Sequence, residues 1–232
     1  MNRSGCHSSR PPVVLLHGTA STPASNFTPL AARLLASGRC VFAVLYGSVF
    51  GLGGIGDIDA SAGQVATFID QVRSTTAAPR VDVVAFSQGA LVLRDALQGT
   101  LDPATVRVAV LLAPNYHGTT VRLAGKVPAS ICPACSQQGT GSALLRRLAA
   151  AGELSGSIRY ATLSTRQDTW VLPIADQAPR GPDDRVRSQL LQDSCPTATV
   201  GHIDLPAAPP ALNWAVAALD TDGRPPPTFH CN

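Results

Sequence analysis

The sequence predicts an α/β protein with a mostly parallel, doubly wound sheet and helices on both of its faces. Short apolar runs rich in β-branched residues alternate along the chain with segments of helical periodicity. The runs are nearly continuous in apolar character, which is typical of parallel strands buried on both sides. Alternating strands and helices of this kind form parallel sheets with right-handed crossovers.

The first strand is expected at residues 13–16, a short apolar run that ends at His17 and Gly18. Gly38 stands where a left-handed helix cap is expected. The helix before it shows one apolar face, made of Phe27, Leu30, Ala31, Leu34 and Leu35. Residues 40–45 form the second strand. Residues 47–56 are rich in glycine but match no phosphate-loop spacing, so we interpret them as an ordinary flexible connection.

The same alternation continues to the end of the chain. A helix from about Ile58 carries its apolar face at Val65, Ile69 and Val72. The remaining elements are strands at 81–86, 106–112 and 158–164, and helices at about 91–97, 142–150 and 210–219. No linker interrupts this rhythm, so residues 1–232 are predicted to form a single domain.

Composition indicates a globular protein that binds neither nucleic acid nor a membrane through a spanning helix. Hydrophobic residues make up 45% of the chain and charged residues 14%, which suits a sizeable core. The net charge of +3 comes from scattered arginines and the single lysine Lys126, without a basic stripe. The longest apolar run contains Arg107 and falls well short of the roughly 18 residues that a membrane span needs.

Six cysteines, an even number, fit an oxidising compartment. The start Met1-Asn2-Arg3 looks like a mature secreted terminus with an added initiator methionine, so we expect that a signal was removed and that the protein is extracellular. From their placement we expect three disulfides: Cys6 with Cys40, Cys132 with Cys135, and Cys195 with Cys231. The two long ones would tie the termini to the core.

The run Cys132-Pro133-Ala134-Cys135 has other possible roles, as a redox dithiol or as half of a zinc site. A redox dithiol is expected at a helix start after a strand, and a zinc site needs a second ligand pair at short spacing. The sequence provides neither context. We therefore favour a disulfide that pins a loop.

Ser87 follows a predicted strand and directly precedes a helical pattern, in the run Ala85-Phe86-Ser87-Gln88-Gly89. This is the layout of a nucleophile elbow. There a strained strand-to-helix turn lifts the serine hydroxyl above the sheet, and small flanking residues let the backbone double back. Ala85 stands where glycine is more usual. The alternative is a serine that only caps the following helix.

A serine nucleophile needs a histidine base and an acid that orients the histidine. His202 is the candidate base, because His117 comes too early to leave room for an acid and His230 lies in a proline-rich tail. Asp168 is the candidate acid. It comes shortly after the last predicted strand, from where it can reach a histidine loop at the carboxyl ends of the strands. Asp176 is the second choice, and Asp168 could instead cap a turn.

Acyl transfer also needs hydrogen-bond donors aimed at the developing oxyanion. The backbone amide of Gln88, directly after Ser87, is one candidate. Thr19, in the loop after the first strand, is the other, through its amide and its hydroxyl. His17 in the same loop is interpreted as a residue that shapes the loop and not as a base.

With these residues in place, the chain resembles the α/β-hydrolase lipases of the Candida antarctica lipase B type and related small secreted bacterial lipases. The resemblance spans most of the chain. It rests on His17-Gly18-Thr19, Phe86-Ser87-Gln88-Gly89, residues 113–119, Gln137-Gln138 with residues 141–144, and Asp168 with Val171 and Pro173. It implies the α/β-hydrolase fold, a catalytic triad of Ser87, Asp168 and His202, and an oxyanion hole at Thr19 and Gln88. It also agrees with the two long cysteine pairs.

Several positions depart from that family. Phe86 replaces a tryptophan beneath the pocket, Asn115 replaces an aspartate near the nucleophile, and His17 replaces a proline. By resemblance, Phe86, Asn115 and Gln138 are expected to contact the substrate, and Phe86 should leave more room for the alcohol part of the ester. The short cysteine pair is absent from that family, so the loop that bears it is expected to be stiffer here.

The predicted function is hydrolysis of triacylglycerol or related lipid esters by a secreted lipase, through an acyl-enzyme and without a metal or organic cofactor. A short-chain carboxylesterase, a polyester hydrolase and an acyltransferase are alternatives that differ in pocket shape. A catalytically silent binding protein of the same fold and a thiol-redox protein using Cys132 and Cys135 are alternatives from other classes. We expect a monomer whose partner is a lipid or other ester substrate, either dissolved or presented at a lipid–water interface.

Overall fold

The computed structural model describes residues 1–121 and 127–231 and contains a six-stranded sheet in which all neighbouring strands are parallel. The strands are β1 (Val13–Leu16), β2 (Val41–Ala43), β3 (Val81–Phe86), β4 (Val106–Leu112), β5 (Arg159–Ser164) and β6 (Val186–Leu190). Their order in the sheet is β2-β1-β3-β4-β5-β6. The chain therefore reverses its direction of progress beside β1, as in a doubly wound sheet. The predicted fold class is confirmed.

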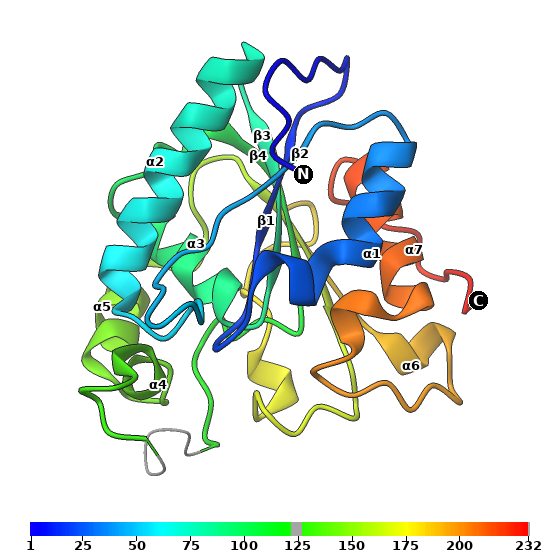
Figure 1. Cartoon of the computed structure of the whole chain (residues 1–232). Helices are drawn as coiled ribbons and strands as arrows, with labels where there is room; N and C mark the ends of the chain where they lie inside the picture. The colour runs from blue at the N-terminus through cyan, green and yellow to red at the C-terminus, as the bar shows by residue number, and fades with distance from the viewer. Residues whose placement is uncertain (122–126, 232) are drawn as a thin grey trace.

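The helices form two layers around this sheet. They are α1 (Pro23–Ala36), α2 (Ile58–Thr76), α3 (Gln88–Gln98), α4 (Pro133–Gln137), α5 (Ala143–Ala151), α6 (Leu191–Ser194) and α7 (Pro209–Asp220), with short 3-10 turns at Pro103–Thr105, Ile174–Asp176 and Leu205–Ala207. Figure 1 shows the sheet nearly edge-on, with α1 and α7 on one face and α2, α3 and α5 on the other.

Strand alternation divides the core between the two faces. Val13 and Leu15 of β1 pack with the residues of α1 and α7, whereas Val14 and Leu16 pack with those of α2 and α3. Successive side chains of a strand point to opposite sides, so a strand covered on both faces must be apolar at every position. All four residues of β1 are fully buried.

Side-chain caps set where the helices begin. Thr22 accepts a hydrogen bond from the amide of Ser25 at 3.1 Å, and the Ser25 hydroxyl accepts one from the amide of Thr22 at 2.9 Å. Asp57 caps α2 by accepting from the amide of Ala60 at 2.9 Å. Each cap satisfies a backbone donor that has no partner within the helix.

Three differences from the sequence prediction stand out. The edge strand β6 and the short helices α4 and α6 were not predicted, and β2 is shorter than residues 40–45. The flexibility predicted for residues 47–56 stays a prediction, but the segment has local structure. Backbone hydrogen bonds close a turn between Val49 and Leu52, and a bridge joins Gly53 to Ser21.

All six cysteines are bonded, in the three pairs that were expected. The Cys6–Cys40 bond ties the N-terminal segment to the start of β2, and the bond from Cys195 to Cys231 ties the C-terminal tail to the end of α6. The Cys132–Cys135 bond joins the N-cap of α4 to its third residue. Among the helices of the described residues, none combines the length and the apolar character required to cross a bilayer.

Candidate active site

Ser87 occupies a sharp turn between β3 and α3, with φ +53° and ψ −120°. Such a backbone conformation is strained for any residue other than glycine and costs on the order of 1–3 kcal/mol. Its amide donates to the carbonyl of Leu112 at 3.0 Å, and its carbonyl accepts from the amide of Asn115 at 3.0 Å. A Cβ at Gly89 would lie 2.4 Å from the Leu16 carbonyl oxygen, so the second small residue of the elbow is required here.

A continuous hydrogen-bonded line runs from Ser87 through His202 to Asp168. The Oγ of Ser87 lies 2.9 Å from Nε2 of His202, and Nδ1 of His202 lies 2.7 Å from Oδ2 of Asp168. All three side chains are buried. They come from the turn after β3, the loop after β5 and the loop before α7, which meet at the carboxyl end of the sheet.

The carboxylate of Asp168 is held on both of its oxygens. Its Oδ1 accepts from the amides of Trp170 at 2.8 Å and Val171 at 2.9 Å, and its Oδ2 accepts from Nε2 of Gln177 at 2.9 Å as well as from His202. Burial acts to raise the pKa of Asp168, but the interactions with His202 and the two backbone amides outweigh it, so the pKa lies below its usual value. Asp168 is therefore ionised at neutral pH.

The other candidate residues lie apart from Ser87. Asp176 pairs with Arg180 at 2.7 Å and does not contact His202. His117 contacts Glu153 at 2.9 Å and the backbone carbonyl of Asp176 at 2.7 Å, and His230 is exposed in the C-terminal tail. Of the three histidines that follow Ser87 in the chain, His202 is the one that the structure brings to its hydroxyl.

The loop after β1 packs directly against the serine. A Cβ at Gly18 would lie 3.3 Å from that of Ser87, a tight contact that glycine avoids. The amide of Gly18 donates to Oδ1 of Asn26 at 3.0 Å, which fixes the loop to α1. Gln88 is the first residue of α3, and the first amides of a helix have no partner within it. Thr19 follows Gly18 directly in this loop, and the predicted role of Thr19 and the Gln88 amide as an oxyanion hole stays a prediction.

His17 is part of the wall behind this loop. Its ring is fully buried and stacks on Tyr46, with centroids 4.1 Å apart and an interplanar angle of 7°. Its Nδ1 lies 2.8 Å from the carbonyl oxygen of Gly18. Burial lowers the pKa of His17 to about 4, against a smaller raising effect of the Gly18 contact. The ring is neutral at pH 7, which fits a residue that shapes the loop.

Asn115 and Gln138 are joined to Thr19 by hydrogen bonds. Oε1 of Gln138 accepts from Nδ2 of Asn115 at 3.1 Å, and Oε1 and Nε2 of Gln138 lie 3.1 and 3.0 Å from the Thr19 hydroxyl. Nε2 of Gln138 also donates to the carbonyl of Ala134 in α4 at 3.1 Å. Both amide side chains are almost fully buried, and the predicted contact of Asn115 and Gln138 with substrate stays a prediction.

Phe86 lies directly beneath the site. Its ring carbons would be 3.1 Å from a Cβ at Gly18, and its ring centroid is 5.0 Å from that of His202. The ring therefore supports the loop after β1 and the imidazole at the same time. Its predicted role in admitting the alcohol part of an ester remains a prediction.

Two residues of the site were missed by sequence reasoning. Gln177 holds Asp168, and it sits in a polar, proline-containing loop where no pattern marks it. Asn26 holds Gly18 from the first turn of α1, where its only signal is a polar residue on an otherwise apolar face. Both act through hydrogen bonds that only the folded chain reveals.

Known proteins that are similar to this chain include lipases and other α/β hydrolases. Residues 10–180 match the family described as lipase (class 2). No curated protein matches the chain in sequence. Among solved structures, Aspergillus fumigatus lipase B aligns with a TM-score of 0.78 and 23% identity over 94% of this chain and 54% of its own. The present chain thus spans about half the length of that lipase.

Two further structures share the fold over most of their own length. Bacillus licheniformis lipase BlEst2 in its mature form has a TM-score of 0.56 and 16% identity, with 73% of this chain and 71% of its own covered. MGS-MChE2, an α/β hydrolase enzyme from a metagenome of lagoon sediments at Mar Chica, Morocco, has a TM-score of 0.56 and 14% identity, with 90% of each chain covered. The fold is therefore the α/β-hydrolase fold. Because the family match covers well over half of the sequence, the chain belongs to the lipase (class 2) family.

Proposed function

We propose that the protein is a secreted serine hydrolase that cleaves the carboxylic esters of lipids such as triacylglycerols. The observation that carries this proposal is the hydrogen-bonded line from Ser87 through His202 to an ionised Asp168. Nucleophile, base and orienting acid within hydrogen-bond reach of each other are the arrangement that activates a serine hydroxyl. Membership of the lipase (class 2) family supports lipid esters as the substrate class.

In the first half of the reaction, Oγ of Ser87 attacks the ester carbonyl carbon while Nε2 of His202 takes the hydroxyl proton. The carbonyl oxygen becomes an oxyanion, which accepts hydrogen bonds from the Gln88 amide and from Thr19. Collapse of this intermediate breaks the bond to the alcohol, and His202 delivers its proton to the departing alkoxide. An acyl-enzyme on Ser87 remains.

In the second half, water attacks the acyl carbon and His202 takes a proton from that water. The second tetrahedral intermediate collapses, the proton passes to Oγ of Ser87, and the free acid leaves. Asp168 stays ionised throughout. It keeps Nδ1 of His202 as the protonated nitrogen and stabilises the imidazolium that forms in each half.

Secretion is supported by the three disulfides, because such bonds persist in oxidising compartments and are rare in the cytosol. Cys132 and Cys135 are both buried, with exposed fractions of 1% and 8%. Reactive cysteines are partially exposed, so this burial weighs against the alternative of a thiol-redox protein.

The test combines covalent labelling with an ester series. A serine-directed phosphonate should give a single adduct at Ser87 in the parent protein and none in Ser87→Ala. Hydrolysis of nitrophenyl esters from acetate to palmitate should fall in Ser87→Ala by about 10⁶-fold in kcat. The matched control is Ser74→Ala, an exposed serine on α2, which should behave like the parent.

Each outcome separates the alternatives. Turnover of long-chain esters supports a lipase, and turnover confined to acetate and butyrate would replace it with a short-chain esterase. A parent protein that neither reacts with the phosphonate nor hydrolyses any ester of the series would contradict the proposal and leave a silent member of the fold.

A further inference from the structure

Most of the exposed large hydrophobic side chains gather at one end of the molecule. Eight such side chains are exposed among the described residues, and two of them, Met1 and Leu35, lie elsewhere. The other six belong to loops at the carboxyl end of the sheet, around the candidate site: Leu45, Phe50, Leu52, Ile131, Trp170 and Ile203. Trp170 and Ile203 are close neighbours in the chain of Asp168 and His202. We call these six the apolar rim.

The most prominent member of the rim is Phe50, in the loop between β2 and α2. Its exposed fraction is 99%, so the ring contacts almost nothing in its own chain. The loop that presents it is nevertheless ordered by hydrogen bonds. Val49 and Leu52 each donate an amide to the carbonyl of the other, at 3.0 and 3.1 Å, and close a turn with Phe50 at its tip. An apolar ring of this size held in water is typical of an interaction site.

The base of this loop is bonded to the parts that border Ser87. Gly53 forms a bridge with Ser21 through two backbone hydrogen bonds of 3.0 and 3.2 Å. Nε2 of Gln88 donates to the carbonyl of Gly54 at 2.8 Å, and a Cβ at Gly54 would lie 3.2 Å from Cα of Thr19. A surface that receives Phe50 therefore lies beside the mouth of the candidate site.

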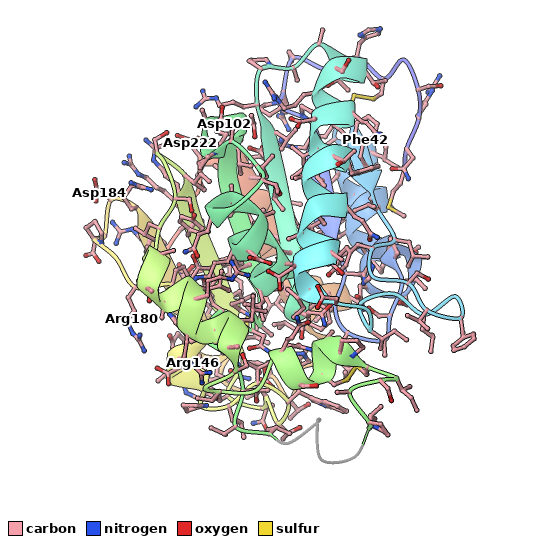
Figure 2. The ribbon with its side chains drawn as sticks, turned by 90° about the vertical axis from the view of Figure 1, so that its left-hand side faces the viewer. Phe42, Asp102, Arg146, Arg180, Asp184 and Asp222 are labelled. Carbon is pink, nitrogen blue, oxygen red and sulfur yellow. A yellow bond between two sulfur atoms is a disulfide. The ribbon has the colours of Figure 1, made fainter. Side chains whose placement is uncertain are left out.

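The charge pattern indicates the chemistry of that surface. Residues 41–56 contain no charged side chain, and neither do residues 127–141, which carry Ile131. In Figure 2 the cyan loop after β2 projects at the lower right, on the opposite side from the labelled Arg146, Arg180 and Asp184. A loop that docks on anionic headgroups is expected to carry lysine or arginine. This one fits an uncharged apolar phase.

We propose that the tip Val49–Leu52 inserts Phe50 into the surface of a neutral lipid aggregate and holds the mouth of the site against it. This proposal rests on the proposed function, since it supplies the physical state of the ester substrate. Leu45 and Leu52 belong to the same loop as the inserted ring, and Trp170 and Ile203, from the loops that bear Asp168 and His202, meet the same lipid surface. The glycine-rich segment thus acts as an anchor and not as a simple connection.

The test measures binding separately from catalysis. The parent, Phe50→Ser and Phe50→Trp are mixed with triolein emulsions stabilised by phosphatidylcholine, and the bound fraction is found by flotation. Phe50→Ser should bind about 10- to 100-fold more weakly, and Phe50→Trp should bind at least as well as the parent. The matched control is Leu35→Ser, which removes a side chain of 44% exposure on α1, away from the rim. It should bind like the parent.

Hydrolysis of dissolved nitrophenyl acetate should be equal in the parent, Phe50→Ser and Leu35→Ser, because Phe50 contacts no part of the site. Equal emulsion binding by the parent and Phe50→Ser would overturn the proposal. So would an equal loss in Leu35→Ser, binding that requires anionic phosphatidylglycerol, or a dimer that Phe50→Ser dissociates without changing emulsion binding. A parent that binds emulsions through Phe50 but hydrolyses no ester would refute the proposed function and leave this proposal standing.

Discussion

At the scale of single residues, the candidate site depends on a carboxylate whose hydrogen bonds are nearly all made inside the protein. Asp168 is buried, yet its pKa lies below the usual value because His202 and two backbone amides favour the charged form over the opposing effect of burial. Gln177 donates to the same oxygen as His202 and also to the carbonyl of Val171 at 2.8 Å. It therefore fixes the direction in which Asp168 presents that oxygen to the imidazole.

Replacing Gln177 by leucine should lower kcat on soluble esters by about tenfold with little change in KM. A hydrogen bond to a charged group contributes about 1.5–3 kcal/mol, of which a part acts on the transition state. Gln98→Leu is the matched control, because Gln98 also donates to a backbone carbonyl, that of Gly152 at 2.7 Å, but far from the site. If both variants lost the same activity, Gln177 would have only a structural role.

At the scale of elements, sequence patterns predicted the strands that are buried on both faces of the sheet and missed the partly exposed edge strand. The strands β1, β3 and β4 are mainly apolar runs, and β3 also explains why Ser87 could be singled out. The strand β5 is buried at all but its first residue, although its sequence also contains Thr162 and Ser164. The edge strand β6 has exposed Arg187 and Ser188 in its middle, as an edge that must not pair with another chain often does. Its polar pattern gives no periodicity to detect.

The short helix α4 escaped prediction for a different reason. It has only five residues, so helical periodicity cannot show in it. Its Cys132–Cys135 bond and the proline at its start hold a helix too short to be stable alone. The sequence could suggest the disulfide but not that the Ala134 carbonyl would hold Gln138, whose side chain meets the Thr19 hydroxyl. Such contacts depend on distances that only tertiary structure sets.

Removing the short disulfide should therefore lower mainly kcat, and removing the long one should lower mainly the stability of the fold. The variant Cys132→Ala/Cys135→Ala should lose several-fold in kcat, because Gln138 and Thr19 lose their fixed support, while the loop entropy of so short a ring contributes only about 1.5 kcal/mol of stability. The variant Cys6→Ala/Cys40→Ala, with a sequence separation of 34, should lose about 4 kcal/mol of stability and keep its kcat. Ester kinetics and urea unfolding measure the two quantities.

One outcome would contradict the predicted effect of the short disulfide on kcat. A short-pair variant with parental kcat would show that α4 does not position Thr19. In that case the network from Asn115 through Gln138 would hold the loop without help from the cysteines.

At the scale of the whole molecule, the carboxyl end of the sheet gathers residues that are far apart in the chain. Chain order and strand ends were enough to predict Ser87, Asp168 and His202 as partners, because the ends of parallel strands share one edge. The same edge carries the apolar rim. No periodic pattern in the sequence predicts this rim, because the exposure of Phe50 and Trp170 depends on the conformation of their loops. The candidate chemistry and the proposed lipid contact thus occupy one end of the protein.

The free energy of unfolding of the whole protein should fall as the solution becomes acidic, because His17 is buried. Its pKa is about 4 in the folded protein against 6.5 in the unfolded chain, because burial disfavours the protonated ring. As the pH falls from 6.5 to 4, the unfolded chain binds a proton that the folded protein rejects. Folding then loses about 1.4 kcal/mol per pH unit, or about 3 kcal/mol in total, and this loss levels off below pH 4.

The variant His17→Phe removes this titration while it keeps a ring to stack on Tyr46, and the Gly18 carbonyl still accepts from the Ser21 hydroxyl at 2.8 Å. The difference in unfolding free energy between parent and variant, measured in urea at pH 7 and at pH 4, should therefore shift by about 3 kcal/mol in favour of the variant in acid. His7→Gln, at an exposed position, should follow the parent at both pH values. Parallel pH profiles for the parent and His17→Phe would mean that the His17 ring already takes up a proton in the folded protein, and that another buried group causes any acid sensitivity.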